Sequence, residues 1–266
     1  MIKKRLLKLW PAYFCAITLI FIFTRRIGLP GRTVSFENYL LNIPFINGFL
    51  SKPYVDGAHW FLTTLVGCLI CYSIINQMEN TKRMAGYYCW VILSIIVMVV
   101  LRSVSAGMIR QLLQTVFTLL GGAYLPFMII GTAYSIEKKK NDSSFLGKGL
   151  IVLASVEVLM GLGLYALVIY YLTLLVLART QSMKLKFLEI ESFKYLGKIS
   201  YSVYLIHQNL GFLIINQIVE IKGRYHVWMS IIVLIMMIFI GGIFYKIIEE
   251  PVNNTICKIL VKGEKL

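Results

Sequence analysis

Several short patterns that mark soluble catalytic sites are missing from this chain of 266 residues. The sequence has no G-x-S-x-G turn, no phosphate-binding G-x-x-x-x-G-K-[ST] loop and no H-E-x-x-H zinc motif. This excludes the serine hydrolases, P-loop enzymes and zinc peptidases that such motifs would identify. It does not exclude chemistry carried out by scattered side chains.

Cysteine is also scarce, with five residues in the chain, four of them inside apolar runs. Cys68 and Cys71 form a single C-x-x-C with no second pair and no neighbouring histidine. Metal sites of this type need further ligands at a fixed spacing, so these cysteines are interpreted as small buried hydrophobic residues. No metal site is predicted.

Acidic residues are few, because 12 Asp and Glu face 27 Lys and Arg, giving a formal net charge of +15. Such a charge can indicate nucleic-acid binding. Here the basic residues fall in short clusters between apolar runs, as they do in the cytoplasmic loops of membrane proteins. Nucleic acid is therefore not predicted as a partner.

Apolar residues dominate the chain, at 58% of its length with a mean hydropathy of +0.76. These values lie far above those of soluble domains and indicate a protein that crosses the lipid bilayer several times. Runs near the length of one bilayer span occur at 6–24, 59–76, 84–101, 113–135, 198–219 and 227–247.

The stretch 148–177 is too long for one ordinary span and short for two, and a Gly-Leu-Gly break lies at 161–163. If it crosses twice and the N-terminus is cytoplasmic, 19 of the 27 basic residues lie in inner segments and 8 in outer loops. A single crossing gives 12 inside and 15 outside. The excess of Lys and Arg on cytoplasmic sides favours two crossings.

The predicted fold is therefore all-α: a polytopic membrane helix bundle of about eight transmembrane helices, with both termini cytoplasmic. No change in composition marks a second domain, so residues 1–266 are expected to form a single integral membrane domain. The longest connection, 25–58, is expected to be an extracytoplasmic loop that packs over the mouth of the bundle.

Polar side chains inside a span are informative because the helix satisfies its own backbone groups. Ser200, Tyr204, His207 and Gly211 fall on one stripe of a helix, at offsets of 4, 7 and 11. If Gly197 lies near the cytoplasmic surface, His207 is roughly 15 Å deep, close to the centre of the bilayer.

Two interpretations of His207 remain open at this stage. In the first, it forms hydrogen bonds that hold neighbouring helices together. In the second, it lines a polar cavity that admits water or substrate at mid-membrane. Tyr204, one turn away, could supply a hydrogen-bond partner in either case.

Three other residues have structural alternatives. Glu157 is the other candidate for a functional polar residue, but it is expected near the outer interface, where a structural or solvated carboxylate is the favoured interpretation. His59 and Trp60, at the start of an apolar run, are typical of an aromatic anchor at the membrane interface.

Four stretches, in order along the chain, resemble a known family. The stretch 196–208 resembles the late L-G-x-I-S-Y-S-x-Y-L-x-H signature of the bacterial membrane acyltransferase-3 family. It reads LGKISYSVYLIHQ. Near the start, KKRLLKLWPAY is similar to the family's basic R-x-x-R with a following proline. VDGAHWFLTTL is similar to its tryptophan-containing helix start, and YKIIEEPVNN to its closing Glu-x-Pro.

This resemblance implies transfer of an acyl group, usually acetyl, from cytoplasmic acyl-CoA to a sugar hydroxyl of a surface or exported glycan such as an O-antigen. It implies acetyl-CoA or another acyl-CoA as the donor substrate, a polysaccharide acceptor and a bacterial inner membrane as the location. No residue pattern indicates a protein partner. The alternatives are a transporter or flippase, or a polymerase, for lipid-linked sugars, which also need a polar pocket at mid-membrane.

The family assigns its general-base histidine to a first helix upstream of the R-x-x-R region. Met1 falls where family members begin their third span, so the resemblance predicts that this chain lacks the first two of ten spans. Either translation starts inside a longer gene, or the chain is a truncated product that could lack activity.

Two further positions depart from the family pattern. Lys8 replaces the second arginine of R-x-x-R, and Leu65 stands where many members have glutamate. The resemblance implies that Arg5 and Lys8 bind CoA phosphates, although lysine lacks the bidentate grip of arginine. Both could equally be anchors at the inner face of the membrane.

The resulting hypothesis assigns each candidate residue a role. His207 and Tyr204 are the candidate catalytic residues, with His207 accepting a hydrogen bond or proton on the acceptor side, second to the family's first-helix histidine. Trp60, His59 and Ser200 are assigned to substrate binding.

Overall fold

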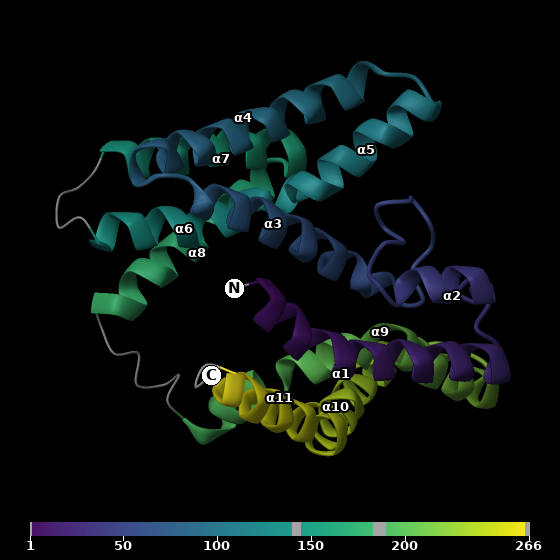
Figure 1. Ribbon diagram of the computed structural model, residues 1–266. Coiled ribbons are helices and arrows are strands. Elements are labelled where there is room, and N and C mark those ends of the chain that lie inside the picture. The colour runs from purple at the N-terminus through teal and green to yellow at the C-terminus, as the bar shows by residue number, and fades with distance from the viewer. Residues whose placement is uncertain (1, 140–144, 183–189, 264–266) are drawn as a thin grey trace. The chain divides into compact units, whose positions relative to one another are not determined.

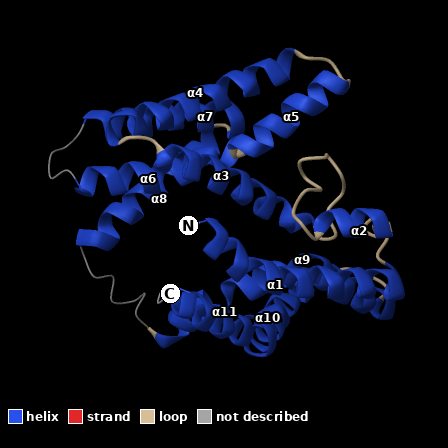
Figure 2. Cartoon of the chain, in the orientation of Figure 1, coloured by secondary structure: helices blue, strands red, loops and turns tan. Residues whose placement is uncertain are grey.

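The computed structural model describes residues 2–139, 145–182 and 190–263. Throughout these residues the regular structure is helical and no strand occurs (Figure 2). This confirms the predicted all-α fold class. The helices are α1 (Ile2–Phe23), η1 (Thr24–Gly28), α2 (Phe36–Asn42), η2 (Gly57–His59), α3 (Trp60–Gln77), α4 (Asn80–Ser103), α5 (Met108–Leu120), η3 (Gly122–Tyr124), α6 (Leu125–Lys139), α7 (Phe145–Leu162), α8 (Leu164–Ser182), α9 (Glu191–Lys222), α10 (Val227–Phe244), η5 (Tyr245–Glu249) and α11 (Glu250–Gly263).

By length and composition, 5 helical segments within the described residues can cross a membrane, which agrees with a polytopic membrane protein. The apolar run at 198–219 lies inside α9, which extends beyond it at both ends. The total of eight crossings stays a prediction. The five segments are Arg5–Gly28, Gly57–Gln77, Lys82–Ser103, Met108–Tyr134 and Val227–Lys258.

The ambiguous stretch 148–177 forms two helices, as the Gly-Leu-Gly break predicts. Helix α7 ends at Leu162 and α8 begins at Leu164, with Gly163 between them at a φ of +84°. Only glycine adopts this conformation without steric cost, which explains why the helix stops there. Both helices extend beyond the predicted stretch, into 145–147 and 178–182.

The apolar run 113–135 overlaps the segment Met108–Tyr134, which is long and apolar enough to cross a membrane, but it is not one uninterrupted helix. The segment divides into α5 and α6, with a break that begins at Gly121, whose φ is +111°. The indole Nε1 of Trp90 on α4 donates a hydrogen bond of 2.7 Å to the carbonyl of Leu120, at the end of α5. A tertiary contact thus satisfies a carbonyl at the end of the helix.

The chain separates into two compact units. The first consists of Met1–Asn47, Lys52–Phe61 and Lys186–Leu266, and the second of Gly48–Ser51 and Leu62–Leu185. In the first unit, α9 packs along α10 and α1 (Figure 1). In the second, α4 packs on α5 and α7, and α6 packs on α7. The candidate site lies within the first unit.

Glu157 lies inside the second unit and is fully buried. The hydroxyl of Ser94 on α4 donates a hydrogen bond of 2.5 Å to its Oε1, joining α4 to α7. A buried carboxyl group needs such a partner. The solvated alternative for Glu157 is therefore wrong, and its structural role stays a prediction.

Close packing in the second unit depends on Gly67 of α3. A Cβ atom there would lie 2.5 Å from the carbonyl oxygen of Leu119 on α5, a backbone atom that cannot rotate away. We expect Gly67→Ala to lower the free energy of unfolding by about 1–3 kcal/mol through overpacking. Gly131→Ala on α6 is the matched control, because no atom lies within 4 Å of its Cβ position. The check is thermal unfolding of both variants in detergent micelles, and equal melting temperatures would contradict this packing.

Candidate active site

Four sequence stretches that lie far apart in the chain meet around α9 in the first unit. The hydroxyl of Tyr201 donates to the carbonyl of Leu9 on α1, at 2.9 Å. The hydroxyl of Tyr204 donates to the carbonyl of Ala58 in η2, at 2.6 Å. The stretches 3–13, 55–65 and 196–208, singled out from the sequence alone, are thus neighbours in space.

The fourth stretch joins the same cluster through a buried side-chain pair. Ser202 is buried on α9, and its hydroxyl donates to Oε2 of Glu249 in η5, at 2.5 Å. Glu249 is itself largely buried, so the serine hydroxyl supplies a polar partner that water cannot. Glu249 is the first residue of the closing Glu-x-Pro.

At the centre of the cluster, two side chains bind one turn of the α9 backbone. Oδ2 of Asp56 accepts from the amide of Asn209 at 2.9 Å, and Nε2 of His59 donates to the carbonyl of Leu205 at 2.9 Å. In an α-helix the amide of residue 209 faces the carbonyl of residue 205. The carboxylate of Asp56 and the imidazole of His59, both from the segment 55–59, therefore bind an amide and a carbonyl that face each other within one turn of α9.

The Asn209 side chain adds two further bonds on the same side of α9. Its Nδ2 donates to the carbonyl of Val55 at 2.7 Å, and its Oδ1 accepts from Nη1 of Arg32 at 3.2 Å. Asp56 and Asn209 are both buried. The segment 55–59 is thus held against the middle of α9 by backbone and side-chain bonds in a region with little exposure to solvent.

The connection 25–58, apart from Gly48–Ser51, belongs to this unit and runs back along α1. The indole of Trp10 donates to the carbonyl of Ile43 at 2.9 Å, and the hydroxyl of Tyr13 donates to that of Asn42 at 2.9 Å. Trp10 lies 13 residues before the end of α1, roughly 20 Å along its axis. The connection contains the short helix α2 and is more regular than its composition predicts. Its extracytoplasmic side stays a prediction.

His59 is a core residue, with 1% of its surface exposed. The interpretation of His59 as an interfacial anchor is therefore wrong, because an anchor of that kind lies at a surface. A carbonyl only accepts hydrogen bonds, so Nε2 carries a proton and, in the neutral ring, Nδ1 carries the lone pair. Nδ1 is buried without a hydrogen-bond partner among the described residues. Substrate binding by His59 stays a prediction.

His207, on α9, differs from His59 because its side chain is exposed. Its Nδ1 donates to the carbonyl of Tyr204, at 2.9 Å, which leaves Nε2 as the lone-pair nitrogen of the neutral ring. In the neutral rings, the nitrogen that carries the lone pair is therefore Nδ1 in His59 and Nε2 in His207. His59 binds the backbone of α9, and His207 has Nε2 available for a proton or hydroxyl.

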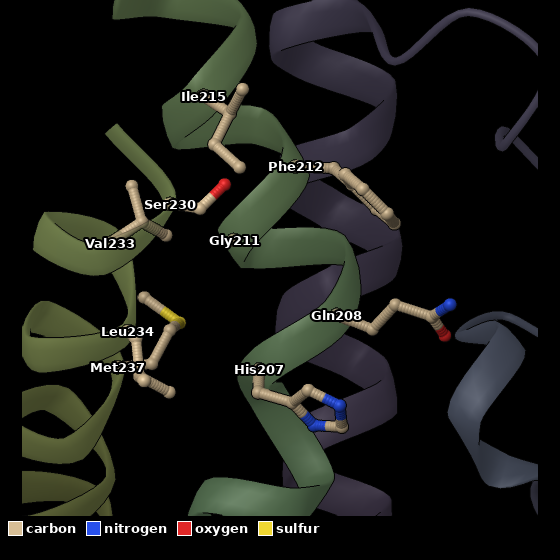
Figure 3. A pocket seen from close by; sticks show the side chains of 9 residues that line it. All are labelled: His207, Gln208, Gly211, Phe212, Ile215, Ser230, Val233, Leu234 and Met237. Atoms are coloured by element: carbon tan, nitrogen blue, oxygen red, sulfur yellow. The ribbon is translucent and has the colours of Figure 1, made fainter. Parts of the chain in front are cut away.

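A cavity of about 320 Å³ lies between α9 and α10, with His207 and Gln208 at one end (Figure 3). His207, Gly211 and Ile215 follow one another along α9, at the spacing of one helix face. The cavity opens to the surface of the unit, because several of its lining residues are exposed. Its lining consists of His207, Gln208, Gly211, Phe212, Ile215, Ser230, Val233, Leu234 and Met237.

Only part of the predicted polar stripe of α9 lies at the cavity or forms hydrogen bonds to the segment 55–59. Tyr204, His207 and Gly211 border the cluster or the cavity. Ser200 is exposed, and its hydroxyl donates to the carbonyl of Gly197 in its own helix, at 2.8 Å. Trp60 is 37% exposed and lies edge-on to the ring of Phe61.

Arg5 and Lys8 are exposed in the first turns of α1. Their spacing of three residues places them on neighbouring positions of one helix face. Their binding to CoA phosphates stays a prediction. Within the described residues no group of three or more His, Cys, Asp or Glu side chains could hold a metal ion.

Sequence reasoning missed the residues that carry most of the hydrogen bonds in the cluster: Asp56, Asn209, Ser202, Glu249 and Arg32. Two signals were available. Ser202 and Asn209 are seven residues apart, a spacing that returns to the same face of a helix. Asp56 and Glu249 lie inside stretches that had already been singled out, but nothing in a linear sequence shows their partners.

The geometry predicts that Asp56 is essential for the stability of the first unit. Its Oδ1 and Oδ2 accept from the amides of Ala58 and Asn209, and Asp56→Ala removes both acceptors from a buried place. We expect a loss of about 1–3 kcal/mol in the free energy of unfolding, with a smaller loss for Asp56→Asn. Denaturant unfolding in detergent measures it. Glu37→Ala, at an exposed carboxylate of α2, is the control, and an equal effect of both alanine variants would refute the assignment.

Comparison with known proteins accounts for the meeting of the four stretches. Residues 1–247 match the acyltransferase-3 family, described as an acyltransferase domain. No curated protein and no solved structure matches the chain. The family match covers nearly the whole chain and decides in favour of acyl transfer over transport or polymerisation. The chain belongs to the acyltransferase-3 family and is a multi-pass membrane acyltransferase.

Proposed function

We propose that this acyltransferase transfers an acetyl group from acetyl-CoA to a sugar hydroxyl of a cell-surface or exported polysaccharide. The observation that carries the proposal is the placement of His207. His207 lines one end of a cavity, on the helix where the family stretches converge, and Nε2 is the lone-pair nitrogen of its neutral ring. A sugar hydroxyl is a weak nucleophile, and a nearby imidazole is the side chain best suited to accept its proton.

In the proposed step, Nε2 of His207 accepts a hydrogen bond from the acceptor hydroxyl and then takes its proton, which makes the ring an imidazolium. The oxygen then forms a bond to the carbonyl carbon of the thioester and the carbon–sulfur bond breaks. CoA leaves as a thiolate and is protonated by the imidazolium. Tyr204 positions the ring, because its carbonyl accepts from Nδ1 and its hydroxyl is bound to Ala58.

The donor and acceptor are proposed to approach from different sides of a bacterial inner membrane. Arg5 and Lys8, at the start of α1, would bind CoA phosphates from the cytoplasm, the side on which both termini are proposed to lie. Trp60, His59 and Ser200 would bind the glycan acceptor, because their aromatic and hydrogen-bonding side chains are of the kinds that contact a glycan. Of these, Trp60 and Ser200 are exposed in the first unit.

Replacement of His207 tests the proposal. We expect His207→Ala to lower acetyl transfer about 10- to 100-fold, a range between one lost hydrogen bond and a lost general base. The measurement is incorporation of label from radiolabelled acetyl-CoA into polysaccharide by membranes that contain the protein. His226→Ala is the matched control, because that imidazole stacks on Trp228 outside the cluster and should leave the rate unchanged.

An unchanged rate in His207→Ala would remove His207 from the chemistry. Both variants should be present in membranes at equal amounts, because His207 is exposed and its loss leaves the bonds of Asp56 and His59 in place.

A further inference from the structure

Arg32 is a cation whose contacts in the first unit are all neutral. It is half-buried, its Nη1 donates to Oδ1 of Asn209 at 3.2 Å, and its Cζ lies 4.2 Å from the centre of the Phe212 ring. Within the described residues, no carboxylate forms an ion pair with Arg32. A guanidinium has five donors, and the one bond to Asn209 leaves donors for an anion.

This cation lies over the ring of Phe212, one of the residues that line the cavity between α9 and α10. Apart from His207, Gln208 and Ser230, the lining is apolar. Phe212 and Leu234 are exposed at its rim, so the cavity is a groove open along its side. Gly211 contributes to the width of this groove, since a Cβ atom there would lie 3.5 Å from Cγ1 of Val233.

The groove lies beside α10, which is part of the apolar membrane-spanning segment Val227–Lys258. In such a segment an open apolar groove faces hydrocarbon. Arginine inside or near a membrane is costly unless it finds a partner, and the anionic partners that a membrane offers are lipid phosphates. A cation that contacts one wall residue of a mostly apolar groove fits one amphiphilic molecule.

We propose that Arg32 and the α9–α10 groove together bind one anionic membrane phospholipid. The phosphate pairs with the guanidinium of Arg32, which can contact two of its oxygens at once. One hydrocarbon chain lies along the groove, past Gly211 and Leu234. Each methylene group of the lipid chain that lies in the groove packs against side chains there. The phosphate, bound to Arg32, fixes the position of the lipid chain along the groove. The groove is the cavity that has His207 at one end, so the hydrocarbon chain is placed in its apolar part beyond Gly211, and the proposal is tested by lipid binding without an activity measurement.

The test uses the full chain in nanodiscs of phosphatidylcholine that contain a photoreactive phosphatidylglycerol with a diazirine in one acyl chain. After illumination, mass spectrometry locates the label. We expect peptides of α9 and α10 to carry about tenfold more label than with the corresponding photoreactive phosphatidylcholine, the ratio for one charge-assisted hydrogen bond. Equal labelling by the two lipids would overturn the proposal.

Variants of the cation separate lipid binding from a structural role. Arg32→Gln keeps an amide that can donate to Asn209 but removes the charge, and should abolish the preference for phosphatidylglycerol. Arg32→Lys should retain part of it. Arg25→Gln is the matched control, because Arg25 also lies over a ring, that of Phe21. If Arg32→Gln loses thermal stability but keeps the lipid preference, Arg32 only holds the loop and the proposal is wrong.

Variants of the groove test the position of the chain even if a substitution of Arg32 prevents folding. Leu234→Trp places a bulky ring in the groove and should reduce labelling of α9 several-fold. Ile235→Trp is the control, since the neighbouring Ile235 is equally exposed but does not line the groove. Equal effects of the two variants would overturn the proposal. Inorganic phosphate should not compete, and loss of labelling in its presence would mean that the site takes a free anion.

Discussion

The first unit depends on the way Asp56 and His59 bind one turn of α9. Within the helix this amide and this carbonyl already face each other, and here each also binds a side chain from a segment about 150 residues earlier, at separations of 153 and 146 residues. The carboxylate takes the amide of Asn209 and the imidazole takes the carbonyl of Leu205. Since both belong to segment 55–59, the start of α3 and the middle of α9 are fixed relative to each other within this unit.

The same contacts explain why α9 can present different chemistry on two sides. Ser202, Leu205 and Asn209 are buried against α1, η5 and segment 55–59. The side that faces α10 carries His207 and Gly211 and borders the cavity. A helix held firmly on one side can keep an exposed imidazole in a defined position, which a proton acceptor requires. His59 binds the backbone of α9, and the proton-accepting role of His207 stays a proposal.

Several features could be predicted from the sequence because they depend on local chemistry. Apolar runs predicted the membrane helices, and the glycine pair predicted the break at Gly163, where only glycine adopts the required backbone. The break at Gly121 was missed, although it also involves glycine, because the apolar run continues through it without a change in polarity. The burial of His59 was missed for a related reason. A histidine beside a tryptophan at a helix start is typical of an interface, and only its partner Leu205 shows otherwise.

The sequence by itself determined the class of the protein: a helical, basic, multi-pass membrane chain with four stretches that resemble one acyltransferase family. These properties follow from composition, periodicity and local residue order. Only the tertiary structure decided that Asp56, Asn209, Ser202 and Glu249 pair with residues far away in the chain, and that Arg32 lies against Phe212. Hydrogen bonds between distant segments depend on how helices pack, and packing is set by the whole buried surface of a unit, which no single stretch of sequence contains.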